Sequence, residues 1–154
     1  MATFRWTSVL DVPFERVWDF HSRIDGLDAL TPAWVGLSVD SIHIPPGGPE
    51  DVLVPGSEIT LSARPLGVIP GGTWRSRITD RRESADSAMF QDIIVDGPLE
   101  EWTHIHRFDA LPYGTLIHDT VKYALPVPGT DQLMKPLLAA YFAYRHHRTG
   151  RVLG

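Results

Sequence analysis

The residues of this chain that could move protons or bind metals are concentrated between positions 92 and 119. The candidates are Asp92, His104, His106 and Asp119. Successive side chains of a β-strand point to opposite faces, so His104 and His106 would share one face, about 7 Å apart. Trp102 and Phe108 flank them at the same spacing. Two imidazoles between two large aromatic side chains are typical of a pocket wall.

Imidazoles next to carboxylates allow three interpretations. A histidine beside a carboxylate is the usual makeup of a general base, which makes all four residues candidate catalytic groups. The two imidazoles could instead bind a metal if Asp92 or Asp119 pointed at the same spot. In the third interpretation the histidines hydrogen-bond buried carboxylates and only fix the sheet. We expect no bound metal and no cofactor.

The two aspartates are expected to face the interior. Alternation places Asp92 on the side of its strand that carries Phe90, and Asp119 on the side that carries Val121 and Tyr123. A carboxylate among apolar side chains is unusual for a solvated surface, and it needs a partner if it is buried. The histidines of a neighbouring strand could supply that partner.

Large side chains at alternating positions could form the wall of a ligand cavity. Aromatic residues in strands belong to the core more often than to a ligand site, so each of these side chains could be either a core residue or a ligand contact. The candidate ligand-binding residues are Trp74, Phe90, Trp102, Phe108, Val121, Tyr123 and Tyr141. Trp6 and Trp18 are instead expected to pack the first strand and the first helix into the core.

Composition limits the class of protein. The 154 residues are 43% hydrophobic, which is enough to bury the core of one domain spanning residues 1–154. The net charge of -5 argues against nucleic acid or an anionic membrane as a general partner. Without cysteine there is no disulfide, thiolate nucleophile or cysteine-ligated zinc. No apolar run approaches the length of a membrane span, and the first residues lack a signal-peptide pattern, so we expect a cytoplasmic protein.

Alternation and β-branched residues predict seven strands separated by proline and glycine runs. The expected strands cover 3–12, 37–44, 58–63, 73–82, 88–95, 100–108 and 115–125. After the first strand, Pro13 and the helical spacing of the apolar residues behind it predict a short helix over 13–22. A second short helix is predicted over 25–30, with Asp25 as its N-cap.

The longest predicted helix is the last element of the chain. It begins at Thr130 or Asp131, either of which could cap it, and Pro136 either kinks it or marks its effective start. Its expected apolar face carries Leu133, Leu137, Ala140, Tyr141 and Tyr144. The paired His146 and His147 would favour the dipole near its C-terminal end, and no further role is assigned to them.

These elements predict an α+β domain. Strands in series form an antiparallel sheet, and the apolar face of that sheet must be covered. The C-terminal helix carries the largest apolar stripe available to cover it. If the sheet curls around the helix without full contact, the gap between them is a cavity with apolar walls and a few polar groups.

The order of the elements and several motifs resemble the helix-grip superfamily, also termed SRPBCC or START-like, which includes Bet v 1-like and polyketide cyclase/dehydrase-like proteins. The segment 12–20, with the pattern Pro-x-Glu-x-Val-Trp-x-Phe, is similar to the strand-to-helix junction of that superfamily. The segments 90–108, with its His-x-His, 119–126 and 142–145 are also similar. The resemblance covers essentially the whole chain.

The resemblance implies a helix-grip fold, in which a seven-stranded antiparallel sheet curls around a long C-terminal helix and two short helices follow the first strand. It also implies that a small, largely hydrophobic ligand binds in the cavity between the sheet and the C-terminal helix, in a carrier or sensor. The oligomeric state and the identity of the ligand are not specified by these motifs.

Two alternatives to a carrier or sensor remain open. Because the superfamily also contains enzymes, the first is a polyketide cyclase/dehydratase-like enzyme that acts on an aromatic or polyketide-like substrate through the His/Asp cluster. The second is a protein-interaction module with a collapsed cavity, whose loops 48–55 and 65–72 meet a partner. A cavity below roughly 300 Å³ would favour the second alternative.

Overall fold

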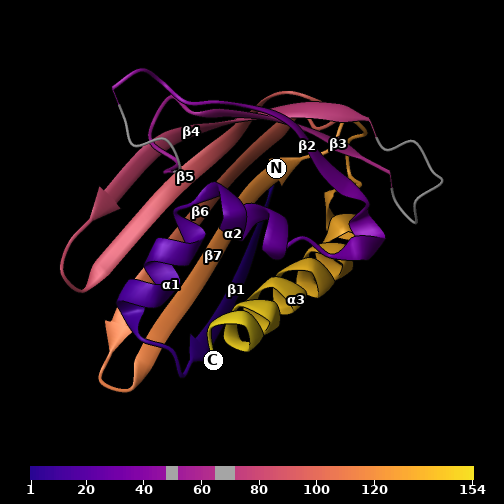
Figure 1. The fold of residues 1–154 in the computed structure, drawn as a ribbon. Helices are drawn as coiled ribbons and strands as arrows, with labels where there is room; N and C mark the ends of the chain where they lie inside the picture. Colours follow the sequence, from indigo (N-terminus) through magenta and orange to yellow (C-terminus); the bar gives the residue numbers. More distant parts are fainter. Residues whose placement is uncertain (48–51, 65–71) are drawn as a thin grey trace.

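Residues 1–47, 52–64 and 72–154 are described by the computed structural model, and in these parts the elements follow the predicted order (Figure 1). The strands are β1 (Ala2–Leu10), β2 (Leu37–His43), β3 (Glu58–Ala63), β4 (Thr73–Glu83), β5 (Ser87–Asp96), β6 (Glu101–Leu111) and β7 (Gly114–Ala124). The helices are α1 (Phe14–His21), α2 (Ile24–Ala29) and α3 (Lys135–Leu153), with short 3₁₀ helices η1 (Ala33–Val35) and η3 (Asp131–Met134). The largest difference at a strand end is in β6, which continues past the expected position 108 to Leu111.

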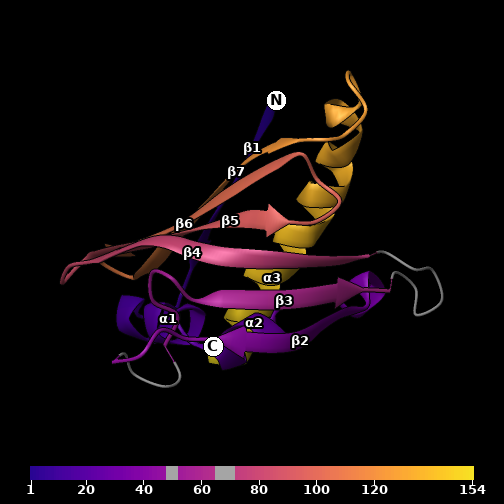
Figure 2. The ribbon, with the colours of Figure 1, turned by 90° about the horizontal axis from the view of Figure 1, so that it is seen from above.

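The strands form one antiparallel sheet of seven strands in the order β1-β7-β6-β5-β4-β3-β2. Strands β2 to β7 are consecutive neighbours, whereas β1 lies at the far edge and pairs with β7. The sheet curls, and all the labelled helices lie on one side of it, with α3 running diagonally across (Figure 1, Figure 2). This arrangement confirms the predicted helix-grip fold.

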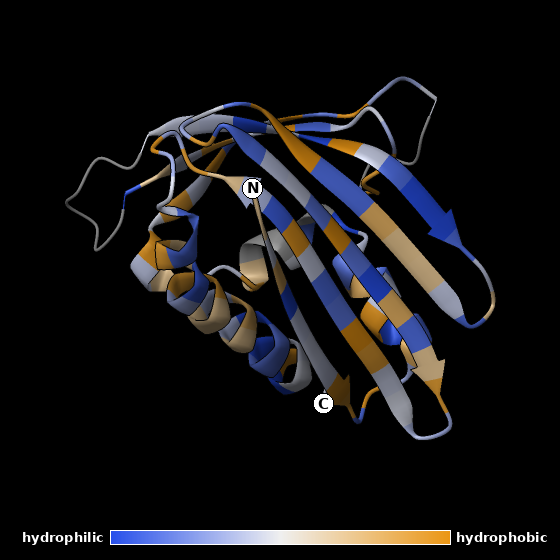
Figure 3. Cartoon of the chain, turned by 180° about the vertical axis from the view of Figure 1, so that it is seen from behind, coloured by the Kyte–Doolittle hydropathy of each residue, from blue (hydrophilic) through white to orange (hydrophobic). Residues whose placement is uncertain are grey.

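Strand β7 shows why the pattern of the sequence produces a one-sided sheet. Its alternate residues Thr115, Ile117, Asp119, Val121 and Tyr123 are all buried, and the residues between them are not. Seen from behind, the strands carry alternating hydrophilic and hydrophobic bands (Figure 3). The buried face includes polar residues, so β7 contributes more than apolar packing to the interior.

The two short helices form close to their predicted positions. Pro13 precedes α1 with φ of −57°, which suits the turn before a helix, and the helix buries Phe14, Val17, Trp18 and His21. Helix α2 begins at Ile24, so Asp25 lies within its first turn. The prediction of Asp25 as the N-cap is therefore wrong, although a carboxylate in the first turn still favours the helix dipole.

Helix α3 differs from its prediction in the face that it buries. The 3₁₀ helix η3 occupies the expected start, and Pro136 stands in the first turn of α3, where its missing N–H costs nothing. The predicted apolar face was wrong, because Leu133 is 76% exposed and Leu137 is 50% exposed. The buried residues of the helix are instead Leu138, Phe142, Arg145, His146 and Thr149.

Two hydrophobic clusters form the core. One joins α1 to the middle of the sheet through residues such as Trp18, Phe90 and Phe108. The other joins α3 to β1 and β7 and contains Ala2, Phe4, Val121, Tyr123, Leu138 and Phe142. The predicted core role of Trp18 is confirmed, while Trp6 is only partly buried beside the second cluster.

Parts of the predicted partner-contacting loops, 48–51 and 65–71, lie outside the described residues. Among the helices that are described, none has the length and the apolar character needed to cross a membrane.

Candidate functional site

Asp119 lies at the centre of a buried polar cluster. Its side chain is only 4% exposed, and it interacts with three imidazoles. The Nε2 atom of His104 donates to Oδ1 at 2.7 Å, and the Nδ1 atom of His106 lies 2.9 Å from the same oxygen. The other oxygen, Oδ2, accepts a hydrogen bond from Nε2 of His146 on α3. One carboxylate therefore holds two strands and a helix together.

Strand pairing places these side chains next to each other. In the register of the sheet, Asp119 on β7 stands directly opposite His106 on β6, and His104 on β6 stands opposite Asp92 on β5. Side chains that are directly opposite in an antiparallel pair lie close enough to interact. The site is consequently built on the rigid part of the sheet rather than on loops.

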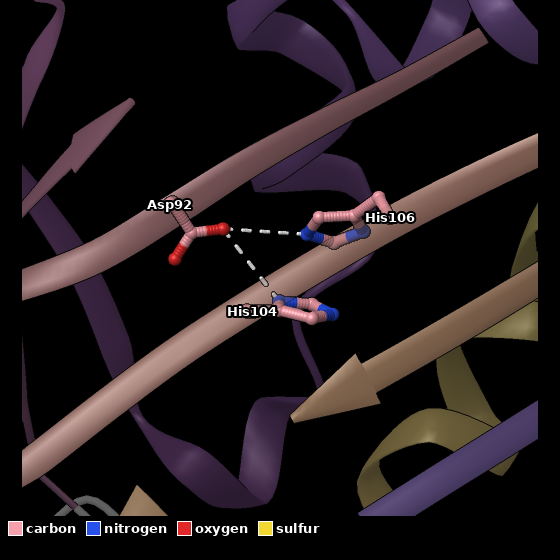
Figure 4. Close-up of side chains that lie close together, drawn as sticks. All are labelled: Asp92, His104 and His106. Atoms are coloured by element: carbon pink, nitrogen blue, oxygen red, sulfur yellow. Dashed lines mark ion pairs between the residues drawn. The ribbon is translucent and has the colours of Figure 1, made fainter. Parts of the chain in front are cut away.

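Asp92 faces the same two histidines from the other side (Figure 4). Its Oδ2 atom lies 3.6 Å from Nδ1 of His104 and 3.4 Å from Nε2 of His106. The hydroxyl of Ser76 on β4 donates to Oδ1 at 3.4 Å. The structure thus brings together all four predicted catalytic candidates and confirms that both aspartates face the interior.

Aromatic rings hold the two imidazoles in place. The ring of Phe90 stacks on His106 with centroids 4.2 Å apart, and Phe142 meets His104 edge-on at 5.0 Å. The two imidazole rings are themselves in contact, with centroids 3.5 Å apart. The orientation of each imidazole is therefore set by packing as well as by hydrogen bonds.

The electrostatics of the cluster favour charged carboxylates. Burial alone would raise the pKa of Asp119, but the charge of His106 and hydrogen bonds from the three histidines outweigh it and hold this pKa well below its usual range. For Asp92, burial again opposes ionisation, and His106 and His104 lower the pKa below its usual value. Both groups are carboxylates at neutral pH.

The pKa values of the two histidines on β6 are shifted in opposite directions. Burial lowers the pKa of His104, and the neighbouring His106 lowers it further against the effect of Asp119. Burial also acts to lower the pKa of His106, but Asp119 and Asp92 together raise it above its ordinary value. The same buried surroundings thus shift the pKa values of the two neighbouring imidazoles in opposite directions.

Three residues of the site, His146, Arg145 and His21, were not among the predicted candidates. His146 is 3% exposed, bonds to Asp119 and places its Nδ1 atom 2.7 Å from the hydroxyl of Ser8 on β1. A ring nitrogen of His21 lies 3.2 Å from the hydroxyl of Thr149. The helical spacing of Leu138, Phe142, Arg145 and Thr149 is the signal that could have identified the inward face of α3.

Arg145 is a buried cation beside this cluster. The residue is 6% exposed, and its Nη1 atom donates to the hydroxyl of Tyr141 at 3.2 Å. Its guanidinium also lies over the Tyr141 ring, 5.5 Å from the centroid. No carboxylate among the described residues forms an ion pair with it, so several of its N–H donors are available to another group.

A cavity of about 600 Å³ opens beside the cluster. Its walls are mainly apolar and include Leu37, Leu61, Ile78, Ile94, Pro98, Leu99 and Leu138. Polar side chains on the wall are His21, Ser76, Asp92, His104, His106 and Arg145. A volume of this size lies within the range of ligand pockets in proteins, and the mixture of walls is typical of them.

The structure divides the predicted ligand-binding residues into two groups. Four of them line the cavity: Trp74, Phe90, Trp102 and Tyr141. Phe108, Val121 and Tyr123 do not line it, because they are fully buried in the two hydrophobic clusters, against α1 and α3. These three side chains therefore belong to the hydrophobic core and not to the cavity wall.

Comparison with known proteins supports the fold and not a specific activity. No protein-family model matches the chain, and no curated protein matches it by sequence. A protein from Chromobacterium violaceum has a similar structure, with a TM-score of 0.68 and 14% identity over 98% of this chain and 96% of that chain. Ara h 8.0201 is similar with a TM-score of 0.65 and 21% identity, over 99% of this chain and 97% of that chain.

A further similar structure is a point mutant of norcoclaurine synthase from Thalictrum flavum, in complex with a transition-state analogue. Its TM-score is 0.67 and its identity 11%, over 99% of this chain and 93% of that chain. These likenesses extend over nearly the whole of each molecule. The chain therefore shares the helix-grip fold of these proteins.

Proposed function

We propose that this helix-grip protein is a carrier or sensor that binds a small, largely apolar ligand with one anionic group in the cavity between the sheet and α3. The observation that carries the proposal is the cavity of about 600 Å³, whose apolar walls surround a small set of adjacent polar groups. Apolar walls supply most of the binding free energy, and a few polar groups fix the orientation of the ligand.

Arg145 supports the anionic part of this proposal. A buried cation is costly unless it is paired, and the hydroxyl of Tyr141 is a neutral partner. A carboxylate, phenolate or enolate on the ligand would pair with the free N–H donors of the guanidinium. The ligand would then lie with its charged end at Arg145 and its apolar body against Trp74, Ile78 and Leu61.

A fluorescent probe tests this function directly. Anilinonaphthalene sulfonate is a small apolar anion, and we expect one molecule to bind per chain with increased fluorescence. Arg145→Met should weaken binding about 10- to 100-fold, the value of a charged hydrogen bond. Ile94→Trp, which places a larger side chain in the cavity wall, should also weaken it. The matched control is Arg148→Met, on the exposed side of the same helix, which should bind the probe like the wild type.

Circular dichroism of each variant separates lost binding from lost folding. Unchanged probe binding in a folded Ile94→Trp variant would refute the proposal. If the variants behave as expected, native mass spectrometry of the protein purified from its own host would identify the natural ligand by the extra mass that the protein retains.

A second candidate function is a cyclase- or dehydratase-type enzyme. The observation that favours it is the position of Asp92, His104 and His106 on the cavity wall, where they could exchange a proton with a bound carbonyl compound. A carbonyl ligand recovered from the protein would be incubated with it in heavy water. Deuterium uptake by the ligand that is lost in His106→Gln would support an enzyme. No uptake in the presence of the wild type would favour a carrier or sensor.

The third alternative, a protein-interaction module with a collapsed cavity, has less support. The cavity is about twice the volume of roughly 300 Å³ below which ligand binding would lose its basis.

A further inference from the structure

Asp92, His104 and His106 each direct one metal-binding atom at a common point on the cavity wall. The ligand atoms of the three residues all lie within 4.8 Å of one another. Figure 4 shows one oxygen of Asp92 facing a nitrogen of each ring. The side chains come from paired strands, β5 and β6, so the sheet holds their positions.

The spacing of these atoms suits a metal better than direct hydrogen bonds. Oδ2 of Asp92 lies 3.6 Å from His104 and 3.4 Å from His106, whereas hydrogen bonds of this type are commonly about 2.7–3.2 Å long. Two ligands held about 2.1 Å from a tetrahedral centre are about 3.4 Å apart. The observed separations therefore leave room for an ion between the carboxylate and the rings.

Asp119 prepares both imidazoles to bind a metal. A carboxylate can only accept hydrogen bonds, so Nε2 of His104 and Nδ1 of His106 must present their hydrogens to it. In a neutral imidazole the opposite nitrogen then carries a lone pair, and these opposite nitrogens are the ones that face Asp92. A carboxylate that orients metal-binding histidines in this way is a common feature of zinc sites.

We propose that Asp92, His104 and His106 form a binding site for a first-row divalent metal ion of the zinc type, with Asp119 as the carboxylate that orients both histidines. Two nitrogen ligands and one oxygen ligand suit zinc, cobalt and iron(II). The carboxylates of Asp92 and Asp119 balance the two positive charges of the ion. Three protein ligands would leave a fourth position for an oxygen atom of a ligand bound in the cavity, which all three residues line.

The positive charge of Arg145 would repel a cation bound at the proposed metal site. It lines the same cavity, but its guanidinium bonds to Tyr141 and forms no ion pair with Asp92 among the described residues. The ion and the guanidinium thus contact different groups. An anionic ligand between them would interact with both.

Calorimetric titration tests the proposal on the full chain. After dialysis against a chelator, we expect the protein to bind one Zn²⁺ or Co²⁺ per chain, and bound Co²⁺ should show the visible absorption of a four-coordinate ion. Asp92→Ala and His106→Gln should each abolish this binding. Asp119→Asn should weaken it about 10- to 100-fold, the usual effect of losing an orienting carboxylate.

His147→Gln is the matched control, because His147 is exposed on α3 next to the buried His146. It should bind both ions like the wild type. Circular dichroism shows which variants are folded, and Asp92→Ala keeps the test decisive if Asp119→Asn does not fold. A folded wild type that takes up neither ion would overturn the proposal, as would a folded Asp92→Ala that binds them as tightly as the wild type.

Discussion

Oδ2 of Asp119 lies 2.5 Å from Nε2 of His146, and this contact joins β7 to α3 inside the core. Both side chains are 4% exposed. Since Oδ1 of the same carboxylate also interacts with two histidines of β6, Asp119 connects the sheet to the helix that closes the cavity. The carboxylate therefore supports the site and the stability of the fold together.

Asp119→Asn should lower the free energy of unfolding by about 3 kcal/mol, because removing one member of a buried charged network leaves the others without compensation. The new amide also points N–H donors at imidazole N–H groups. Urea unfolding followed by tryptophan fluorescence measures the change. The control is Asp80→Asn, which removes a surface ion pair with Arg82 and should cost below about 1 kcal/mol. Equal effects of the two variants would contradict the central role of Asp119.

Phe142→Ala should destabilise the protein by about 3–5 kcal/mol, the usual cost of emptying an aromatic site in a core. Phe142 is fully buried against Phe4 and His104. Leu137→Ala on the same helix should cost below about 1 kcal/mol, because that side chain is half exposed. The pair is measured by thermal and urea unfolding, and a larger loss for Leu137→Ala would mean that α3 buries its predicted face after all.

Substitution of two glycines by alanine should have opposite effects. A Cβ at Gly97 would lie 2.5 Å from the Cβ of Trp74 in the cavity wall, so Gly97→Ala should cost about 1–3 kcal/mol and change the tryptophan fluorescence. A Cβ at Gly150 in α3 would meet Leu10 at an ordinary 3.5 Å. Gly150→Ala should therefore stabilise the helix by up to about 1 kcal/mol. Stabilisation by both changes would show that Gly97 is not closely packed.

His21 should make stability depend on pH. Burial and then the charge of Arg145 lower the pKa of His21 well below its ordinary value, with His106 and His146 acting in the same direction and Asp119 against it. The unfolded chain takes up a proton near the ordinary imidazole pKa of about 6.5, so the contribution of neutral His21 is complete above that pH and is lost as the pH falls below it.

The wild type should therefore lose more stability than His21→Gln between about pH 7.5 and pH 5. Urea unfolding of both proteins at each pH gives the difference, in which the titration of other shared groups largely cancels. The same pH dependence in both proteins would show that His21 is not held neutral by its surroundings.

Alternation was enough to predict the sheet, because a strand with one buried face repeats every two residues. The same rule predicted that Asp92, His104, His106 and Asp119 face the interior, since each shares its strand face with large apolar or aromatic residues. Pairing of β5, β6 and β7 then brings the four together, but the register that places His106 opposite Asp119 depends on turns and strand ends, where the prediction was least accurate.

Helix α3 could not be predicted in the same way. Its inward face carries Arg145, His146 and Thr149, so a search for apolar residues at helical spacing selected the wrong side. A buried polar residue is recognised only through its partners, and the partners of His146 lie on β1 and β7, far away in the sequence. The same reasoning explains why Phe108, Val121 and Tyr123 were assigned to the cavity: their inward direction was right, but only the positions of α1 and α3 show what covers them.

Because β1 pairs with β7, the sheet cannot be completed until β7 has been synthesised. Ala2 is paired with Tyr123, and the amino group of Met1 lies 3.2 Å from a carboxylate oxygen of Asp131. A ribosome releases the N-terminal segment first, so β1 has no neighbouring strand until β7 has emerged. The cavity then closes only when α3 follows. The proposed ligand and metal sites are therefore complete only after both β7 and α3 have been synthesised.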